Sequence, residues 1–350
     1  MNRYTADILL IGQGLAGTVL AERLLHYGLT VRIIDRGHRG SATKEAAGVI
    51  NPVTGRRLVK SWRIDEWLPF AHTYYRQLEQ TYGIKLWYDL PVLRLFTDVA
   101  MANNWDVRMQ HEAYAAYLDH FPPDRRAAWP VRAPYGAGLI RRGARADIAG
   151  LIGFFSTRWQ EARLLEVDTF RHGDLRLVPR GITYRGARYR KAIFCEGHFA
   201  TQNPLFTGLP FQPSKGELWL VRIPGMPRHH IVKRKIALVP IGQDLFWAGA
   251  TNFWDFADDR PSAEGAAWLG DELDKTLTGS YEVVAHRAAI RPTVRHRRPI
   301  TGFPENLAGT LAGKLNQNRI GIFNGFGTKG TSLIPAFADE MARMLRRDLD

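Results

Sequence analysis

The feature that most constrains the fold lies near the N-terminus, where a strand, a glycine turn, a helix and a second strand follow one another directly. The stretch "DILLIGQGLAGTVLAERLLHYGLTVRIIDRG" occupies residues 7–37. Its apolar runs predict strands at Ile8–Ile11 and Val31–Asp35, and the pattern between them predicts a helix over about 16–27. This order is typical of a βαβ start. It predicts an α/β fold built around a parallel sheet.

Three glycines in this turn have the spacing of a dinucleotide cradle. Gly12, Gly14 and Gly17 form G-x-G-x-x-G after a strand and at the head of a helix. The first two permit a tight turn and the close approach of a pyrophosphate, and the third lets the helix pack on the strand. The phosphates would meet backbone N–H groups around Leu15 and Ala16, at the positive end of the helix dipole. A βαβ turn without a ligand is the competing interpretation.

Asp35 ends the second strand and narrows the choice of nucleotide. A carboxylate there accepts hydrogen bonds from ribose hydroxyls and repels a 2′-phosphate, which disfavours NADP. The turn and the carboxylate together do not distinguish NAD from FAD.

A second glycine loop near the C-terminus favours FAD. Gly325, Gly327 and Gly330 stand just before a helix that we expect to begin near Thr331. When a flavin is reduced, negative charge develops along its N1–C2=O edge. Backbone N–H groups, a helix N-terminus and the ammonium of Lys329 would stabilise that charge. A plain strand-to-helix turn with Lys329 in solvent is the alternative.

With these motifs the chain resembles the FAD-dependent amine oxidoreductases of the D-amino-acid oxidase, glycine oxidase and sarcosine oxidase family. Four stretches spread over nearly the whole chain carry the resemblance: the first glycine turn with Asp35–Arg36, "SATKEAAGVINP" (41–52), "AIRPTVRHRRPITG" (289–302) and "NGFGTKG" (324–330). It implies a discontinuous Rossmann-like domain that binds FAD without a covalent bond, with an inserted antiparallel-sheet substrate domain. The expected FAD-binding segments are 1–61, 136–212 and 286–350, and the expected substrate-domain segments are 62–135 and 213–285.

The resemblance also implies further contacts with FAD. In the family the second stretch follows the flavin ring and pyrophosphate, which corresponds to Ser41, Ala47 and Gly48. Val167 in "LLEVDTF" matches the valine whose backbone meets the adenine. Arg36, Gly330 and Thr331 belong to the matched motifs and are expected at the cofactor too.

The turn "FCEG" is similar to the N-A-G or C-A-G turn of the family, and it ends at Gly197. Glu196 stands where the family usually has alanine. Cys195, the single cysteine, is interpreted as buried packing because no partner for a nucleophile accompanies it.

Oxidation of an amine next to a carboxylate needs no acid–base residue when the amine arrives neutral. A hydride passes from the α-carbon to flavin N5, and the imine hydrolyses in water. An arginine is the favoured partner of the carboxylate. Arg291 in "IRPT" matches the carboxylate-binding arginine of the family, with Arg295 as a weaker candidate, and a structural salt bridge is the competing role. Asn51, followed by Arg56 and Arg57, is a candidate substrate contact, although a solvated loop explains it equally well.

The order of four stretches points to one branch of the family. "PSKGELWLVRIPG", "WAGATN", "RPTVRHRRPITG" and "GFGTKGTSLIP" are similar to the FAD-dependent half of the bacterial bifunctional enzyme that modifies the tRNA wobble uridine. That half oxidatively removes a carboxymethyl group from a carboxymethylaminomethyl uridine. The methyltransferase half has no counterpart in these residues, and His296 replaces the usual acid. A small amine (glycine, sarcosine or a D-amino acid), a modified tRNA, and a flavin-binding protein without amine oxidation all stay open.

The composition bounds the partners. Lys and Arg number 48 against 34 Asp and Glu, a net charge of +14, which would attract nucleic acid. A solvated, arginine-rich surface is the plainer interpretation, although basic clusters stand at 228–235 and 295–298. We expect no metal site, no membrane segment and a cytoplasmic location, and nothing in the sequence indicates an oligomeric state.

The remaining elements are expected from local patterns. Amphipathic helices are predicted at about 65–82, stopped by Gly83, and over 103–121. A glycine-bearing turn and a helix are expected within 136–162, and alternating strands from Pro213 to about Ile290.

Overall fold

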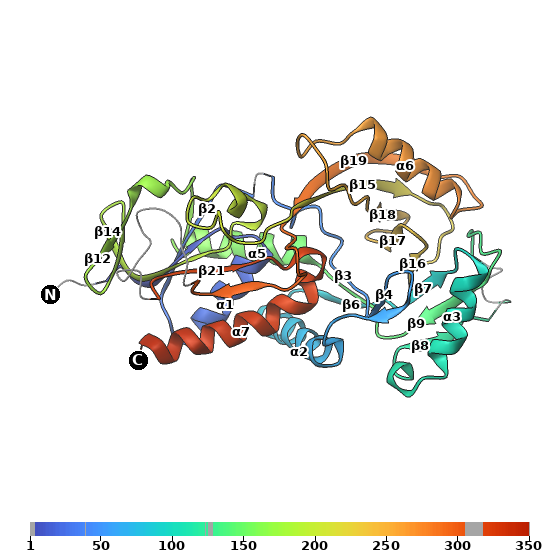
Figure 1. Cartoon of the computed structure of the whole chain (residues 1–350), viewed down its shortest axis with the longest axis horizontal. Coiled ribbons are helices and arrows are strands. Elements are labelled where there is room, and N and C mark those ends of the chain that lie inside the picture. Colours follow the sequence, from blue (N-terminus) through green and yellow to red (C-terminus); the bar gives the residue numbers. More distant parts are fainter. Residues whose placement is uncertain (1–3, 39, 123, 125–128, 305–317, 350) are drawn as a thin grey trace. The chain divides into compact units, whose positions relative to one another are not determined.

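The computed structural model describes residues 4–349 except 39, 123, 125–128 and 305–317. The chain divides into two compact units (Figure 1). Unit 1 comprises Met1–Ala46, Ile148–Ser214 and Ile290–Asp350, and unit 2 comprises Ala47–Asp147 and Lys215–Ala289. Both units combine helices with sheets, which confirms the α/β fold class.

Unit 1 is built on a sheet whose central strands run parallel. Its main path is β11 (Leu165–Val167), β2 (Val31–Asp35), β1 (Ala6–Ile11), β14 (Ala187–Phe194), β13 (Gly181–Tyr184) and β12 (Leu175–Val178). The end of β14 also pairs in parallel with β21 (Ile320–Asn324), which pairs with β20 (Ile300–Gly302). Ile8, Leu9 and Leu10 of β1 are completely buried, as expected for a strand covered on both faces.

Three α-helices belong to unit 1: α1 (Leu15–His26), α5 (Ile148–Glu161) and α7 (Gly330–Leu349). Helices α1 and α7 pack against each other. Tyr27, just past the end of α1, donates a 2.8 Å hydrogen bond from its hydroxyl to the Asp339 carboxylate of α7. Short 3-10 turns lie at His172–Asp174, Gly197–Gln202 and Gly327–Lys329.

Unit 2 contains a mostly antiparallel sheet. Its order is β19 (Glu282–Arg291), β15 (Ser214–Arg222), β18 (Leu245–Gly249), β17 (Ala237–Pro240), β16 (Ile231–Lys233), β7 (Val92–Leu95), β9 (Ala137–Ile140) and β8 (Leu118–His120). β16 and β7 pair in parallel, whereas β15–β18, β18–β17, β17–β16, β7–β9 and β9–β8 pair antiparallel. Two small sheets complete it: β3 (Val49–Ile50), β10 (Ala144–Ala146) and β6 (Trp87–Asp89), and β4 (Val53–Thr54) with β5 (Val59–Lys60).

The helices among the described residues of unit 2 are α2 (Ile64–Tyr82), α3 (Val99–Met109) and α6 (Ala263–Asp274), with a 3-10 turn at Glu112–Tyr114. Gly83 ends α2 in a left-handed conformation (φ 67°), as its position in the sequence predicts. The side chain of Ser262 begins α6 by accepting a hydrogen bond from the Gly265 N–H.

Two of the local predictions were wrong in part. The helix expected over 103–121 ends at Met109, and its second half forms a 3-10 turn and β8, because Leu118 pairs with Ile140 across the sheet. The run of strands expected from Pro213 to about Ile290 is interrupted by α6, whose serine cap outweighs the surrounding strand pattern. The turn expected before α5 contains the strands β9 and β10.

The division into units also differs from the expected segments. Residues 47–61 and 136–147 lie in unit 2 rather than with the first glycine turn. The reason is strand pairing, since β10 pairs with β3 on one side and with β6 on the other.

Candidate active site

Three parallel strands of unit 1 end side by side. In the register, Ile11 of β1 lies opposite Phe194 of β14, which lies opposite Ile322 of β21. The chain therefore leaves the same edge of the sheet at the first glycine turn (residues 12–17), at the 195–197 turn and at the C-terminal glycine loop (residues 325–330). The Asn324 amide connects two of them, donating a 2.8 Å hydrogen bond to the carbonyl oxygen of Gly197. In an α/β sheet this edge is where ligands bind.

The first glycine turn is packed as its spacing predicts. A Cβ on Gly17 would lie 1.9 Å from the Gly12 carbonyl oxygen, so only glycine lets α1 approach the turn. Gly12 has φ 100°, and a Cβ there would lie 2.5 Å from the Cys195 carbonyl oxygen. A Cβ on Gly14 would meet nothing closer than the Thr43 hydroxyl at 3.2 Å. At Gly14, therefore, only the end of a side chain limits the space, whereas at Gly12 and Gly17 backbone atoms fill it.

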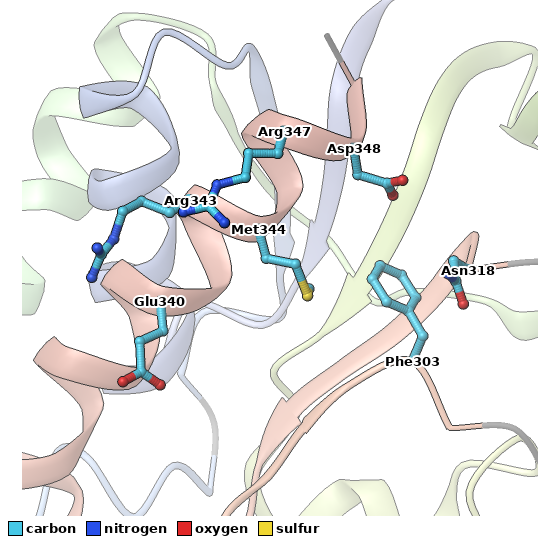
Figure 2. Close-up of a pocket in the computed structure, with 7 residues that line it drawn as sticks. All are labelled: Phe303, Asn318, Glu340, Arg343, Met344, Arg347 and Asp348. Carbon is cyan, nitrogen blue, oxygen red and sulfur yellow. The ribbon is translucent and has the colours of Figure 1, made fainter.

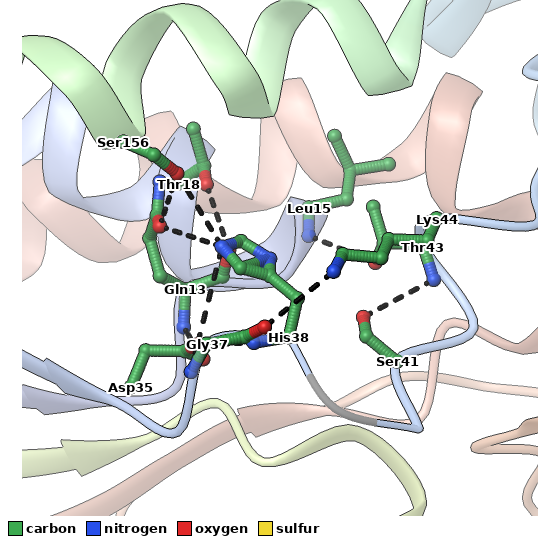
Figure 3. Close-up of polar contacts among 10 residues, drawn as sticks. All are labelled: Gln13, Leu15, Thr18, Asp35, Gly37, His38, Ser41, Thr43, Lys44 and Ser156. Atoms are coloured by element: carbon green, nitrogen blue, oxygen red, sulfur yellow. Dashed lines mark hydrogen bonds and ion pairs between the residues drawn. The ribbon is translucent and has the colours of Figure 1, made fainter. Parts of the chain in front are cut away.

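The start of α1 presents backbone donors with no acidic residue in its first turn and no side-chain cap at Gly14. Thr43 Oγ1 accepts a 3.2 Å hydrogen bond from the Leu15 N–H, and Ser41 Oγ accepts one from the Thr43 N–H (Figure 3). Ala16 is half-buried in the same turn. Ser41 is thus linked to the first glycine turn through Thr43, a neighbour that sequence reasoning missed.

The Asp35 carboxylate is held by three backbone donors (Figure 3). Its Oδ2 accepts a 2.8 Å hydrogen bond from Gln13, and its Oδ1 accepts from Gly37 and His38 at 2.8 Å each. A carboxylate offers about four acceptor positions, so about one is left for a further donor. Asp35 is 9% exposed, and these hydrogen bonds fix the position of its side chain.

A polar cluster behind Asp35 was not expected from the sequence. The Gln13 amide oxygen lies 2.9 Å from His38 Nε2 and accepts a 2.8 Å hydrogen bond from the Ser156 hydroxyl of α5 (Figure 3). Burial lowers the pKa of His38, although the Asp35 carboxylate opposes this. The neutral ring therefore ties the loop after β2 to the first glycine turn. No local pattern predicts this, because Ser156 is far away in the sequence.

Val167 and Arg36 flank the same region. Val167 ends the edge strand β11 opposite Asp35 and is 56% exposed. Its Cγ1 lies 3.6 Å from the Cβ position of Gly37. The Arg36 guanidinium lies 3.9 Å from the centre of the Phe199 ring. An exposed apolar surface beside a held carboxylate is suited to a nucleoside.

The 195–197 turn carries a buried carboxyl group. Burial raises the pKa of Glu196 to about 7, and the Asn203 amide donates a 2.7 Å hydrogen bond to it. Gly197 follows with φ 60°. Cys195 is 4% exposed, and burial raises the pKa of its thiol, so its interpretation as packing is confirmed.

The C-terminal glycine loop lies next to the first one. Gly325 and Gly327 have φ of 79° and 53°, and α7 begins at Gly330 with no acidic residue in its first turn. The Cβ position of Gly330 lies 3.7 Å from the Leu15 side chain of α1. Thr331 is buried in the first turn of α7. Two helix N-termini, both without acidic residues, therefore lie together in unit 1.

The two predicted catalytic residues are associated with this loop. Burial lowers the pKa of Lys329 to about 8, although part of the side chain reaches solvent. Burial also lowers the pKa of Arg291. The segment after Arg291 packs on the loop, with Thr293 Cγ2 3.5 Å from the Cβ position of Gly327. Arg291 therefore stands two residues before Thr293, which contacts the loop that carries Lys329.

Three predicted residues lie in unit 2. Gly48 has φ 69° and its carbonyl accepts a 2.9 Å hydrogen bond from Ala146, next to Ala47. The Asn51 side chain accepts a 3.2 Å hydrogen bond from the Val53 N–H within its own turn. Arg56 lies 3.4 Å from the Asp98 carboxylate, and Arg57 is exposed.

A cavity of about 640 Å³ lies elsewhere in unit 1 (Figure 2). One face of α7 from Glu340 to Asp348 lines it, together with Phe303 and Asn318. Glu340 stands ten residues after Gly330, about 15 Å along the helix, so the cavity is separate from the glycine loops. Within the described ranges no group of histidine, cysteine and carboxylate side chains could hold a metal ion. No helix in that part of the chain is long and apolar enough to cross a membrane.

The comparison with known families decides the class. The model of the DAO family, described as FAD dependent oxidoreductase, matches residues 7–344. The chain belongs to this family. As a DAO-family protein it is an FAD-dependent oxidoreductase, and FAD is its cofactor.

Several solved DAO-like structures share the fold. The chain resembles iminodiacetate oxidase from Chelativorans sp. BNC1, with a TM-score of 0.77 and 22% identity over 96% of this chain and 94% of that one. It also resembles glycine oxidase from Geobacillus kaustophilus, with a TM-score of 0.78 and 18% identity over 98% and 95%. At these identities the likeness shows the fold alone.

One curated relative is the tRNA 5-methylaminomethyl-2-thiouridine biosynthesis bifunctional protein MnmC of Idiomarina loihiensis. The two are 22% identical over 366 residues. The match covers 98% of this chain and 56% of that protein, so the chain spans little more than half of its length.

The residues of unit 1 fit the cofactor of the family. A dinucleotide needs a place where its phosphates approach a backbone closely, and Gly14 leaves that room while its neighbours are packed. It also needs a polar partner for the ribose, and the Asp35 carboxylate is held in place with an acceptor position left for one. The positive ends of α1 and α7 suit the negative charge of the phosphates and of a reduced ring.

Proposed function

We propose that this DAO-family oxidoreductase oxidises a C–N bond of an amine that carries a carboxylate, such as glycine, sarcosine or a D-amino acid. The observation that carries the proposal is the packing of the segment after Arg291 onto the C-terminal glycine loop, next to Lys329. A cation for a substrate carboxylate and a cation for a reduced ring are thereby associated with one loop. The names of two structural neighbours, iminodiacetate oxidase and glycine oxidase, agree with such substrates.

The residues that would hold FAD follow from the geometry and the family motifs. In this proposal the first glycine turn with Leu15 and Ala16 receives the pyrophosphate, assisted by Ser41. Asp35 and Arg36 hold the ribose side, and Val167 and Gly197 border the adenosine. The C-terminal glycine loop with Thr331 supports the ring. For Ala47 and Gly48, contact with FAD stays a prediction from the family motif.

When bound, FAD supplies a two-electron oxidation, taking a hydride from the α-carbon of the substrate at its N5. Arg291 binds the substrate carboxylate through its planar guanidinium and so fixes which C–H bond faces the ring. Lys329 adds positive charge where the ring becomes negative. With a pKa of about 8, the Lys329 ammonium is mostly protonated at pH 7, and an anion bound beside it would favour the protonated form further. For Asn51, contact with the substrate stays a prediction from the sequence.

Two variants test these roles. Arg291→Ala should raise the amine KM at least tenfold, the size expected for a charged hydrogen bond, with a smaller change in kcat. Lys329→Met should slow flavin reduction and lower the flavin midpoint potential, while the amine KM stays close to that of the wild type. An unchanged KM in the first variant, or an unchanged potential in the second, would remove that residue from the proposed site.

A second candidate substrate is a tRNA whose wobble uridine carries a carboxymethylaminomethyl group. The observation favouring it is the match of 98% of this chain to the bifunctional tRNA-modification protein. The carboxymethylamino group is itself a glycine-like secondary amine, so the same site would serve. A protein that binds FAD without oxidising any amine is the remaining alternative, and flavin that no amine reduces would indicate it.

A further inference from the structure

An exposed basic turn lies at the candidate active site. The turn comprises residues 295–298, and all four of its side chains are exposed: Arg295, His296, Arg297 and Arg298. It connects Val294 to β20, which begins at Ile300. We refer to it as the basic turn.

Both ends of the basic turn are fixed against the C-terminal glycine loop. The Val294 Cγ1 atom lies 3.0 Å from the Cβ position of Gly325, and the Ile300 nitrogen lies 3.3 Å from the same position. Ile300 also pairs with Asn324 in the β20–β21 ladder. The positive charges of the turn therefore lie close to the loop that carries Lys329.

Backbone hydrogen bonds hold the conformation of the basic turn. The Arg295 N–H donates a 2.9 Å hydrogen bond to the Pro210 carbonyl, and the Arg297 N–H donates one of 2.9 Å to the Val294 carbonyl. Arg297 adopts φ 52°, a left-handed conformation that is unfavourable for arginine. Among the residues whose positions are described, the side chains of Arg295, His296 and Arg297 form no hydrogen bond or ion pair. A fixed turn thus presents adjacent positive charges that repel one another.

A small amino acid does not account for these charges. Its carboxylate carries a single negative charge, which Arg291 alone would neutralise in the proposed function. Additional cations beside the site would strengthen the binding of a substrate that brings additional negative charge. A chain of phosphates supplies such charge without any need for sequence recognition. The net charge of +14 also favours the binding of a polyanion.

We propose that the basic turn binds the phosphate backbone of the tRNA that presents the amine to the C-terminal glycine loop. This inference rests on the proposed oxidation of a carboxylate-bearing amine and identifies the substrate as one attached to a nucleic acid. Arg295 and Arg297 form the phosphate contacts, and they set the affinity for the tRNA rather than the chemistry of the oxidation.

The test compares two double variants of the FAD-loaded protein. Arg295→Gln/Arg297→Asn removes two charges from the basic turn, and asparagine tolerates the left-handed conformation at 297. The matched control, Arg176→Gln/Arg180→Asn, removes two exposed charges at β12 of the same unit, where Arg180 also has a left-handed φ of 62°. The binding of tRNA carrying the carboxymethylaminomethyl group is measured against salt concentration, and flavin reduction is followed anaerobically.

We expect the basic-turn variant to bind this tRNA about tenfold or more weakly near physiological salt, since each contact counts as one charged hydrogen bond. The slope of log K against log salt should become shallower by about 1.5, because two phosphate contacts are lost. The control should retain the affinity and slope of the wild type. Equal binding by the basic-turn variant and the wild type, or an equal loss in the control, would overturn the assignment.

Flavin reduction separates this inference from the function on which it rests. Reduction of the wild type by the modified tRNA and by no free amine supports both. Reduction by glycine or sarcosine, with no reduction by the tRNA, would leave amine oxidation standing and overturn the role of the basic turn. Absence of reduction by every amine and by the tRNA would overturn both.

Discussion

The two glycine loops of unit 1 look alike in sequence but use glycine for different reasons. In the first glycine turn, a Cβ on Gly17 or Gly12 would lie within 2.5 Å of a backbone oxygen. In the C-terminal glycine loop the closest contact of any added Cβ would be 3.0 Å, between the Cβ position of Gly325 and the Val294 side chain. The first loop needs glycine because backbone segments touch there, whereas the second needs it mainly for left-handed conformations.

This difference separates packing from binding. Gly12 and Gly17 are structural, and Gly14 alone leaves space in the first turn. In the C-terminal loop Gly325 and Gly327 reverse the chain so that the loop leads into α7. Substitutions should therefore differ sharply in size between the two loops, and within the first loop they should differ in kind.

The largest effect is expected for Gly17→Ala. The new methyl group would collide with the Gly12 carbonyl, and backbone cannot move aside as a side chain can. We expect the free energy of unfolding to fall by about 3 kcal/mol or more, at the upper end for overpacking. Gly14→Ala is the matched control: it should change stability by less than about 1 kcal/mol but weaken FAD binding at least tenfold. Urea unfolding and FAD titration measure both, and equal losses of stability would contradict the comparison.

Glu196→Gln examines the turn between the loops. In the folded protein the pKa of Glu196 is about 7, above the ordinary value of 4.5. Its protonated carboxyl group therefore contributes its full stability below pH 4.5, and this contribution is lost as the pH rises towards 7. Glutamine does not ionise and keeps an acceptor for Asn203. The variant should match the wild type near pH 4 and exceed it by up to about 3 kcal/mol above pH 7.

Unfolding free energies at a series of pH values test this prediction. Glu161→Gln, an exposed change at the end of α5, serves as the control and should leave the pH profile unaltered. A stability difference between Glu196→Gln and the wild type that does not vary with pH would show that the carboxyl group is not shifted.

Asn324→Ala removes the bond that joins the two loops. It leaves the half-buried Gly197 carbonyl without its 2.8 Å donor and the buried Gly325 N–H without its 2.7 Å acceptor. The expected cost is about 2 kcal/mol, because buried polar groups lose their partners. Asn104→Ala, on an exposed position of α3, is the control. If thermal unfolding shows the two variants to be equally stable, the connection between the loops contributes nothing.

The smallest effect is expected for Gly327→Ala. Its Cβ would find ordinary contacts at 3.5 Å, so only the left-handed backbone (φ 53°) opposes the change. A cost of about 1 kcal/mol follows, and Gly327→Asn should cost less. A loss as large as that of Gly17→Ala, measured by urea unfolding, would mean that the two loops do not differ as described.

The elements that the sequence predicts well are those whose signals are local. β2 has the predicted bounds, because an apolar run is followed directly by Asp35 and a turn. α2 ends where Gly83 supplies the left-handed cap. The prediction for residues 103–121 was wrong in part, because the same spacing of aromatic side chains occurs in a helix in the first half and in a 3-10 turn and a strand in the second.

The candidate site divides in the same way. The packing of Gly12 and Gly17 can be predicted because their contacts lie within the turn itself or at Cys195, directly after the adjoining strand β14. The Gln13–His38–Ser156 cluster and the Asn324–Gly197 bond cannot, since each joins segments that only the folded sheet brings together. The carboxyl group of Glu196 is visible in the sequence, but its raised pKa depends on burial.

The most direct test of the central claim is anaerobic mixing of the FAD-loaded protein with carboxylate-bearing amines, followed by the flavin absorbance. Glycine, sarcosine, D-alanine and tRNA carrying the carboxymethylaminomethyl group are mixed in turn. We expect at least one of them to bleach the flavin, and the Arg291→Ala variant to require at least tenfold more of it for the same rate. Flavin that stays oxidised with all four would contradict the claim that this protein oxidises carboxylate-bearing amines.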